Sequence, residues 1–130
     1  MRAVLQRVSK GSVSVDNKIV AQIGLGYVIL LGIGPDDTPQ LAGELAEKTA
    51  YLRVFEDDAG KMNRSLADTG GGLLLVSQFT LAADTRSGMR PSFTTAAPPA
   101  EAERGFNRLV EICRQSHPPG VETGRFGAHM

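Results

Sequence analysis

The strongest constraint on the fold is an uninterrupted apolar run, residues 73–76, that passes directly into the polar side chains of Ser77, Gln78 and Thr80. Consecutive apolar residues without alternation are typical of a strand that is covered on both faces. We therefore expect a central strand over residues 73–81, with its polar end at an edge of the sheet. A rigid strand that delivers small polar groups to a loop is a good scaffold for an active site. The alternative is a strand end whose hydroxyls satisfy only local backbone groups.

Other segments with strand-like composition surround this one. Alternating or apolar runs bounded by turn residues predict strands at residues 4–9, 12–15, 19–23, 27–33, 53–56 and 121–126. The periodicity predicts only two helices, which can cover one face of a sheet but not both. The chain of 130 residues has no repeat or linker, so we expect residues 1–130 to form a single α/β domain.

The two predicted helices carry different signals. The first covers residues 38–52, begins at an apparent capping box of Asp37 and Gln40, and buries a stripe of Leu41, Leu45, Thr49 and Leu52. The second begins at Pro98 and Pro99, buries Ala102, Phe106, Leu109, Val110 and Cys113, and ends at Pro118-Pro119-Gly120.

Composition limits the class of protein. One cysteine excludes an internal disulfide and fits a reducing cytoplasm, and no segment is apolar over the length of a membrane span. The N-terminus reads as a strand, because polar residues interrupt any secretion-signal core. We expect a cytoplasmic protein without a membrane contact.

Charge is segregated along a chain whose net charge is zero. Residues 1–35 carry four basic groups against one acid, residues 36–58 carry seven acids against two bases, and residues 59–92 carry four bases against two acids. Arginine, which outnumbers lysine ten to four, suits bidentate contacts with phosphate. The pattern favours contact with one end of an RNA over wrapping of a long duplex, although a solvated basic face explains it equally well.

The residues needed for common hydrolytic sites are missing. Cys113 lies on the predicted buried helix stripe, and His117 and His129 have no nearby pattern of a catalytic triad. Two histidines and one cysteine far apart do not make a zinc site, and the acidic pair Asp57-Asp58 fits a turn. We therefore expect no metal and no cofactor.

The chain nevertheless carries a long series of specific motifs. They are SQFTLAADTRSGMRPSF from Ser77 to Phe93, together with MRAVLQRVSKGSVSV, GYVILLGI, YLRVFEDDAGKMNRSL and TGRFGAHM, in this order. In sequence and order these segments resemble the D-aminoacyl-tRNA deacylases, which remove D-amino acids from mischarged tRNA. The resemblance covers almost the whole chain. It implies a three-layer β/β/α sandwich with two helices on one face, a homodimer, and the 3′ end of aminoacyl-tRNA as the partner, with no DNA.

The same resemblance assigns roles to individual residues. Ser77, Gln78, Phe79 and Thr80 correspond to the catalytic segment, and Arg7, Met89, Arg90 and Phe93 to substrate-binding positions. An aminoacyl ester is labile, so its hydrolysis needs little beyond positioning and oxyanion stabilisation. Backbone N–H groups at residues 78–80 are candidate oxyanion donors. The resemblance adds assistance by the tRNA 2′-hydroxyl, and glycyl-tRNA(Ala) as a second substrate.

Some roles have alternatives. Thr80 as a covalent nucleophile is a second mechanism, which lacks a visible base. In a regular strand Phe79 would point away from Gln78 and Thr80, toward the core or a pocket wall. Phe93 and Met89 are candidates for packing against adenine, and Arg90 for a phosphate or carboxylate. Phe93 is equally acceptable as a core aromatic, and Arg7 as a surface arginine instead of a support for the chirality-checking loop.

One departure from the family is expected at the C-terminus. Family members end in a hairpin with an Asn-x-Gly-Pro-x-Thr motif, whose cis Gly-Pro bond excludes L-amino acids, and the sequence at Met130 stops before it. Gly34-Pro35 cannot replace that motif. We expect the chain without it to lose activity. The alternative functions are a non-catalytic tRNA-binding or interaction module, and a general small-ester hydrolase, for which no base is visible.

Overall fold

The computed structural model describes residues 1–116 and 120–130. The predictions for His117, Pro118 and Pro119 lie outside these residues. The strands are β1 (Arg2–Val8), β2 (Gly11–Val15), β3 (Lys18–Ile23), β4 (Gly26–Gly32), β5 (Phe55–Glu56), β6 (Met62–Arg64), β7 (Gly72–Ser77) and β8 (Val121–Thr123). The helices are α1 (Pro39–Tyr51), α2 (Leu66–Thr69) and α3 (Pro99–Ser116), with a 3₁₀ turn, η1, at Phe79–Ala82.

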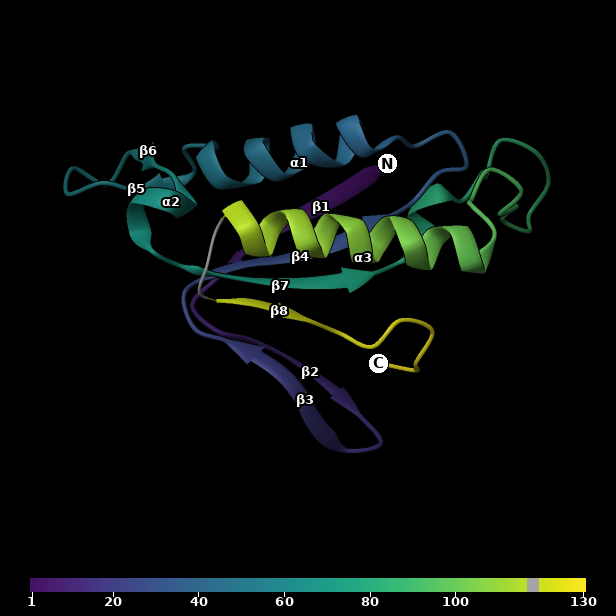
Figure 1. The fold of residues 1–130 in the computed structure, drawn as a ribbon, viewed down its shortest axis with the longest axis horizontal. Coiled ribbons are helices and arrows are strands. Elements are labelled where there is room, and N and C mark those ends of the chain that lie inside the picture. Colours follow the sequence, from purple (N-terminus) through teal and green to yellow (C-terminus); the bar gives the residue numbers. More distant parts are fainter. Residues whose placement is uncertain (117–119) are drawn as a thin grey trace.

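A four-stranded mixed sheet in the order β1-β4-β7-β8 forms the centre of the protein. β1 pairs antiparallel with β4, whereas β4 with β7 and β7 with β8 pair in parallel. The helices α1 and α3 run side by side along this sheet, and β2 and β3 form a separate hairpin (Figure 1). The α/β fold class predicted from the sequence is confirmed.

The strand β7 connects the layers, because its side chains enter two different cores. Leu73 and Leu75 pack with α3 residues in the larger core, and Leu74 and Val76 pack with Val13 and Ala21 of the hairpin in the smaller one. All four β7 side chains are buried. The apolar run therefore has the two-sided cover that its sequence predicts, in a β/β/α arrangement.

The predicted buried face of α3 is confirmed in every position. Ala102, Phe106, Leu109, Val110 and Cys113 are all buried against the sheet. Their spacing follows the helical period without interruption, so the sequence signal and the packing agree.

The predicted buried stripe of α1 is correct at Thr49 and wrong at its leucines. Ala42, Ala46, Thr49 and Ala50 are buried, whereas Leu41 and Leu52 are exposed and Leu45 is half-buried. The face directed inward is the one with small side chains, which let α1 pack closely against its neighbours. Hydrophobicity alone predicts that the leucines of α1 are buried, so the size of the side chains and not their polarity determines which face of α1 points inward.

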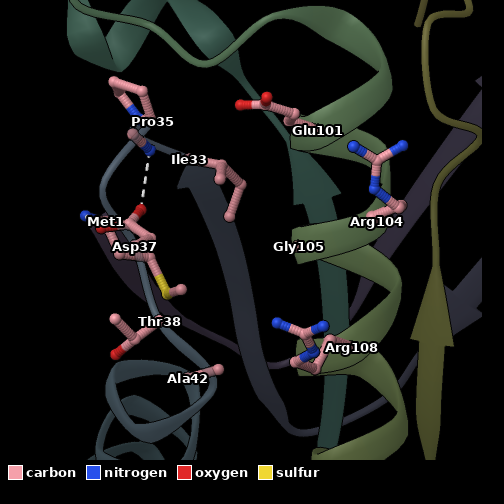
Figure 2. A pocket seen from close by; sticks show the side chains of 11 residues that line it. Met1, Ile33, Pro35, Asp37, Thr38, Ala42, Glu101, Arg104, Gly105 and Arg108 are labelled. Atoms are coloured by element: carbon pink, nitrogen blue, oxygen red, sulfur yellow. Dashed lines mark hydrogen bonds and ion pairs between the residues drawn. The ribbon is translucent and has the colours of Figure 1, made fainter.

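The start of α1 also differs from the prediction. Thr38 is the N-cap, and its Oγ1 accepts from the Leu41 N–H at 3.3 Å. Asp37 does not form a capping box, because its carboxylate accepts from the Met1 ammonium at 2.6 Å and from the Gly34 N–H at 2.7 Å (Figure 2). The capping-box assignment is wrong because a longer-range partner takes the carboxylate.

Turns are predicted better than short strands. Asp16 and Asn17 both have positive φ in the β2–β3 turn, and Asp57 Oδ1 accepts from the N–H groups of Ala59 and Lys61. The short elements β6 and α2 have no counterpart in the prediction, and β8 ends three residues before the predicted strand end. In the described residues, no helix is long and apolar enough to cross a membrane.

Candidate functional site

The central strand ends earlier than predicted, at the point where its neighbour also ends. Ser77 lies opposite Leu31 on β4, and the Gln78 N–H donates to the Leu31 carbonyl at 2.7 Å. β4 stops at Gly32, so the ladder offers no further partner to β7. The chain therefore leaves the strand and forms η1, and the prediction of a strand through residue 81 is wrong.

The turn η1 is held from several directions. A Cβ on Gly32 would lie 3.1 Å from Leu81 Cβ and 3.3 Å from the Gln78 carbonyl oxygen, so only glycine allows this approach without a shift. Arg2 donates to the Leu81 carbonyl at 2.9 Å, and Thr95 Oγ1 donates to the Ala82 carbonyl at 2.7 Å. These contacts position η1 rigidly against the end of the sheet.

Within this turn, the polar groups of the predicted catalytic segment face one another. Gln78 Nε2 donates to Thr80 Oγ1. Because the Gln78 N–H already binds Leu31, it cannot serve as an oxyanion donor while the ladder is intact. The N–H groups of Phe79 and Thr80 begin the 3₁₀ turn and have no acceptor in the described part of the chain, as is usual for the first turn of a helix. Two backbone donors and one hydroxyl are thus available together.

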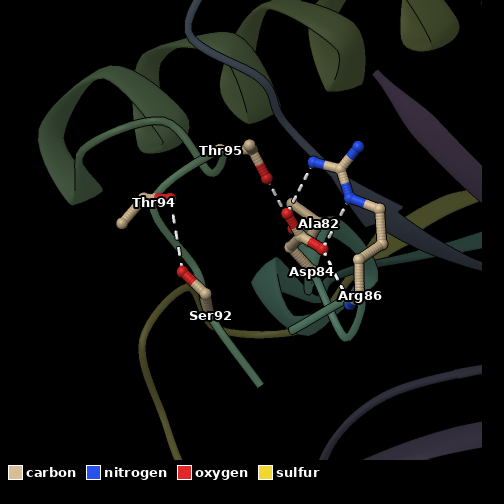
Figure 3. A network of polar contacts seen from close by, with 6 residues as sticks. All are labelled: Ala82, Asp84, Arg86, Ser92, Thr94 and Thr95. Atoms are coloured by element: carbon tan, nitrogen blue, oxygen red, sulfur yellow. Dashed lines mark hydrogen bonds and ion pairs between the residues drawn. The ribbon is translucent and has the colours of Figure 1, made fainter. Parts of the chain in front are cut away.

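A loop that follows η1 is closed at its base by a short bridge. Asp84 and Ser92 exchange backbone hydrogen bonds of 2.7 and 2.8 Å. The Asp84 carboxylate binds the Arg86 guanidinium through both oxygens, at 2.9 and 2.7 Å, and also accepts from the Arg86 N–H (Figure 3). The Arg86 side-chain hydrogen bonds hold the pKa of Asp84 below its ordinary value. These contacts fix the base of the loop.

The loop returns Phe93 to the catalytic segment. The rings of Phe79 and Phe93 meet edge to face, with centroids 5.2 Å apart. Phe79 is 56% exposed, so of the two expected positions, core and pocket wall, the core is excluded. Together with Phe93 it forms an aromatic surface beside Thr80. Met89 and Arg90 lie fully on the surface between Arg86 and this pair, with no polar or ring contact to the described residues 77–80.

The surface around η1 is open on one side. Phe79 and Thr80 are exposed, and the nearest pocket, of about 190 Å³, is lined by Arg2, Gly32, Ala82 and Thr95 among others. Ala82 is the only η1 residue in its lining, so this pocket does not lie over the Thr80 hydroxyl. A substrate would therefore meet residues 77–80 on a surface that the described chain leaves uncovered.

Comparison with known proteins decides the family. The family described as D-Tyr-tRNA(Tyr) deacylase matches residues 4–130. The chain belongs to this family. A protein of Stenotrophomonas maltophilia (strain K279a) named D-aminoacyl-tRNA deacylase is 69% identical over 130 residues, which is all of this chain and 89% of that protein. A protein of the same name from Xanthomonas campestris pv. campestris (strain 8004) is 68% identical over the same shares.

Two solved structures share the fold of this chain. One titled "c-Myc DNA Unwinding Element Binding Protein" superposes with a TM-score of 0.94 at 39% identity, covering 99% of this chain and 87% of that one. Another, titled as a probable eukaryotic D-amino acid tRNA deacylase, has a TM-score of 0.83 at 17% identity and covers 98% and 89%. At that identity the second supports the fold alone.

In this deacylase-family chain, Arg7 lies away from the other predicted site residues. Arg7 is opposite Tyr27 on β4, whereas Ser77 is opposite Leu31 on the same strand. Four residues of strand separate these positions by about 13 Å. The Arg7 guanidinium donates to the Val54 carbonyl at 2.5 Å. One chain therefore does not bring Arg7 to the catalytic segment.

Two buried titratable groups of the deacylase domain are far from the catalytic turn in the fold. Burial raises the pKa of Tyr27, partly offset by the Arg7 charge, and the Tyr27 hydroxyl has no hydrogen-bond partner among the described residues. Cys113 is buried, which confirms it as a core residue, and burial raises its pKa to about 11. In the same residues, no group of three or more His, Cys, Asp and Glu side chains is placed to hold a metal.

Sequence reasoning missed the residues that position the turn. Arg2, Gly32 and Thr95 are separated by dozens of residues and belong to no recognisable local pattern. Only the glycine at the end of an apolar strand gives a signal, because Gly within a strand often marks a close approach of another backbone.

Proposed function

We propose that this chain hydrolyses the ester bond of D-aminoacyl-tRNA and releases a free D-amino acid and tRNA. The observation that carries the proposal is the 69% identity, over the whole chain, to a protein named D-aminoacyl-tRNA deacylase. The arrangement at the end of β7 is chemically compatible with it, since ester hydrolysis requires donors for a developing oxyanion and an ordered substrate.

The N–H groups of Phe79 and Thr80 are the proposed oxyanion donors. A water oxygen adds to the ester carbonyl carbon, and the carbonyl oxygen takes negative charge in front of these two donors. The tetrahedral intermediate then breaks the bond to the 3′-oxygen of the terminal adenosine, which takes the proton that the water loses. The neighbouring 2′-hydroxyl of the tRNA assists this proton transfer.

Thr80 is proposed to orient the substrate and not to attack it. Its hydroxyl oxygen accepts from Gln78 Nε2, which leaves the hydroxyl hydrogen free to donate to the substrate. A nucleophilic hydroxyl needs a base, and no carboxylate or imidazole of the described residues contacts Thr80. Gln78 then acts through Thr80 as a positioning residue, and Ser77 forms the adjoining end of the strand.

The aromatic surface of Phe79 and Phe93 is the proposed contact for the terminal adenine. Edge-to-face ring pairs leave a ring face open for stacking, and RNA-binding proteins use such faces for unpaired bases. Met89 and Arg90, fully exposed on the loop, would extend this surface toward the base and a phosphate or carboxylate.

A second copy of the chain is proposed to complete the site. The catalytic segment is uncovered on one side, and Arg7 is about 13 Å away along the sheet, so a homodimer offers the simplest way to supply missing groups. We further propose a cytoplasmic location, where charged tRNA occurs, and glycyl-tRNA(Ala) as a second substrate, because glycine has no side chain for a chirality filter to reject.

The test is ester loss from matched D-Tyr-tRNA and L-Tyr-tRNA incubated with the 130-residue protein. The sequence without the Asn-x-Gly-Pro-x-Thr motif predicts a loss of activity, but the match to relatives named D-aminoacyl-tRNA deacylase favours selective loss of the D-ester, and that is the result we expect. Thr80→Ala is expected to reduce it, whereas Thr85→Ala, which changes an exposed threonine outside η1, is not. No hydrolysis of either ester would refute the proposal. A DNA duplex is included as competitor, because one similar structure is titled as a DNA-element-binding protein.

A further inference from the structure

A pocket of about 260 Å³ lies between the N-terminal half of α3 and the loop that enters α1. Figure 2 shows Arg104, Gly105 and Arg108 on the α3 side, with Met1 and Asp37 across the gap. No residue of the predicted catalytic or substrate-binding set lines it. It is therefore a feature that the proposed reaction does not yet use.

Two arginines give this pocket its character. Arg104 and Arg108 are four residues apart on α3, so their side chains leave the same side of the helix one turn apart. Neither makes a hydrogen bond or ion pair with any described residue, although Glu101 is only three residues before Arg104. The Glu101 carboxylate and the Arg104 guanidinium point in different directions in Figure 2. Two like charges one turn apart are unfavourable for a helix unless an anion lies between them.

The remaining charges of the pocket do not cancel this pair. The carboxylate of Asp37 is already neutralised by the Met1 ammonium, 2.6 Å away, and by the Gly34 N–H. Only Glu101 opposes the two guanidinium groups, so the lining has a net positive charge. An arginine fork without a protein acceptor is well matched to the oxygen atoms of a phosphate.

The glycine between the arginines shapes the pocket. A Cβ on Gly105 would lie 3.1 Å from Ile33 Cγ2, so the absence of a side chain lets α3 approach the end of β4. Arg104 and Arg108 therefore flank a low point in the helix surface and extend from it on both sides. A small anion can therefore enter the depression at Gly105, between the side chains of Arg104 and Arg108.

The pocket adjoins a smaller pocket at the Ala82 end of η1. It shares Met1, Ile33 and Gly34 with the 190 Å³ pocket whose lining includes Arg2 and Ala82. Ala82 is the last residue of η1. An RNA whose 3′ end lies on the exposed Thr80 would therefore reach Arg104 and Arg108 by passing around the Ala82 end of η1.

We propose that this arginine pocket binds a backbone phosphate of the tRNA acceptor end, on the 5′ side of the terminal adenosine. The inference rests on the proposed function for the identity of the RNA, but the pocket itself does not depend on catalysis. A phosphate held there fixes the direction of the RNA relative to η1, so it contributes affinity and orientation and takes no part in the bond changes.

The direct test measures binding of uncharged tRNA as a function of salt. The double variant Arg104→Gln, Arg108→Gln is expected to weaken binding about tenfold and to reduce the slope of log K against log salt by about 0.7, because one phosphate is no longer neutralised. Arg114→Gln, on the same helix but outside the pocket, is the matched control and should change neither quantity. Glu101→Gln should strengthen binding, because it removes the acid that opposes the arginines. Arg104→Lys, Arg108→Lys should restore much of the slope, since it retains both charges.

A kinetic test separates this proposal from the proposed function. With D-Tyr-tRNA, the double glutamine variant should raise KM with kcat unchanged, because the phosphate interaction is uniform binding. With 3′-O-D-tyrosyl-adenosine, which has no phosphate, the variant and the wild type should be equal. If the wild type hydrolyses neither substrate, the proposed function fails while the salt slope still tests the pocket.

Two results would overturn the pocket proposal. The first is a salt slope and tRNA affinity for the double glutamine variant equal to those of Arg114→Gln. The second concerns stabilisation by inorganic phosphate, measured by thermal melting. If the double glutamine variant loses this stabilisation but binds tRNA as the wild type does, the pocket is a site for a free anion. Circular dichroism of each variant is expected to match the wild type, because both arginines are exposed.

Discussion

The link between Gln78 and Thr80 predicts that their mutations are not additive. Gln78 Nε2 donates to Thr80 Oγ1, and both groups lie at the start of η1 beside the proposed oxyanion donors. Thr80→Val keeps the β-branched shape and removes the hydroxyl, and we expect the rate of D-Tyr-tRNA hydrolysis to fall about ten- to hundredfold. Gln78→Ala leaves the hydroxyl free to rotate. A neutral, solvent-accessible hydrogen bond contributes about 1 kcal/mol, so this change should cost about fivefold.

The double variant distinguishes the two possible roles of Gln78. If Gln78 acts only by holding the Thr80 hydroxyl, its removal from the Thr80→Val protein should cost nothing further, which is a coupling energy of about 1 kcal/mol. The assay is single-turnover ester loss with enzyme in excess, so that product release does not mask the chemical step. An equal fivefold loss in both backgrounds would refute the reasoning and place Gln78 in direct contact with the substrate. Thr85→Val is the control for the removal of a hydroxyl from the neighbouring loop.

Three further changes test other parts of the structure. Gly32→Ala should lower the free energy of unfolding by about 1–3 kcal/mol, because its Cβ would lie 3.1 Å from Leu81 Cβ. Gly43→Ala, whose Cβ would have nothing within 4 Å, should raise the free energy of unfolding by up to about 1 kcal/mol. Thermal melting measures both, and equal effects would contradict the prediction. The folded pKa of Asp84 is lowered, so its contribution to loop order is complete above the unfolded pKa of about 3.9 and is lost as the pH falls through the folded value. Backbone amide hydrogen exchange in residues 85–91, corrected for the intrinsic pH dependence of exchange, should therefore increase on acidification, and Asp84→Asn should abolish that increase; a variant that keeps it argues against the ion pair. Cys113, with a pKa of about 11, should react slowly with iodoacetamide at pH 8 in the native protein and rapidly in denaturant, and fast native labelling would contradict its burial.

Structure was predicted correctly from the sequence where a single physical effect, such as hydrophobic burial at a regular period, determines it. The apolar run of β7 and the five-residue face of α3 were correct, because both depend on hydrophobic burial at a regular period. The Asp57 turn was correct because the carboxylate binds N–H groups two and four residues away. In each case the partner of the residue was either the whole core or a near neighbour.

The prediction failed where a distant partner decided the outcome. Asp37 was assigned to a helix cap, but the Met1 ammonium takes its carboxylate from 36 residues away. The strand was extended to residue 81, but β7 could not continue past the end of β4 at Gly32. Strand alternation directed Phe79 toward the core or a pocket wall, but alternation no longer applies after Ser77, and Phe79 is exposed. Each error comes from long-range geometry that no local pattern contains.

The positions predicted for the catalytic segment converge in space only in part. Gln78, Phe79 and Thr80 share one turn, and Phe93 joins them through the ring of Phe79. These four residues lie close together because the segment from Ser77 to Phe93 is compact. The placement of Arg7 at the other end of the sheet follows from strand register, which the sequence does not specify.

The two side chains that hold η1 are 93 residues apart in the sequence. Arg2 binds the Leu81 carbonyl and Thr95 binds the Ala82 carbonyl, so both must be in place before the turn is fixed. A growing polypeptide on the ribosome contains Arg2 from the start but lacks the second contact until Thr95 has left the exit tunnel. The turn η1 therefore cannot gain both contacts until the chain has been synthesised as far as Thr95, so its final position depends on a residue outside the segment from Ser77 to Phe93.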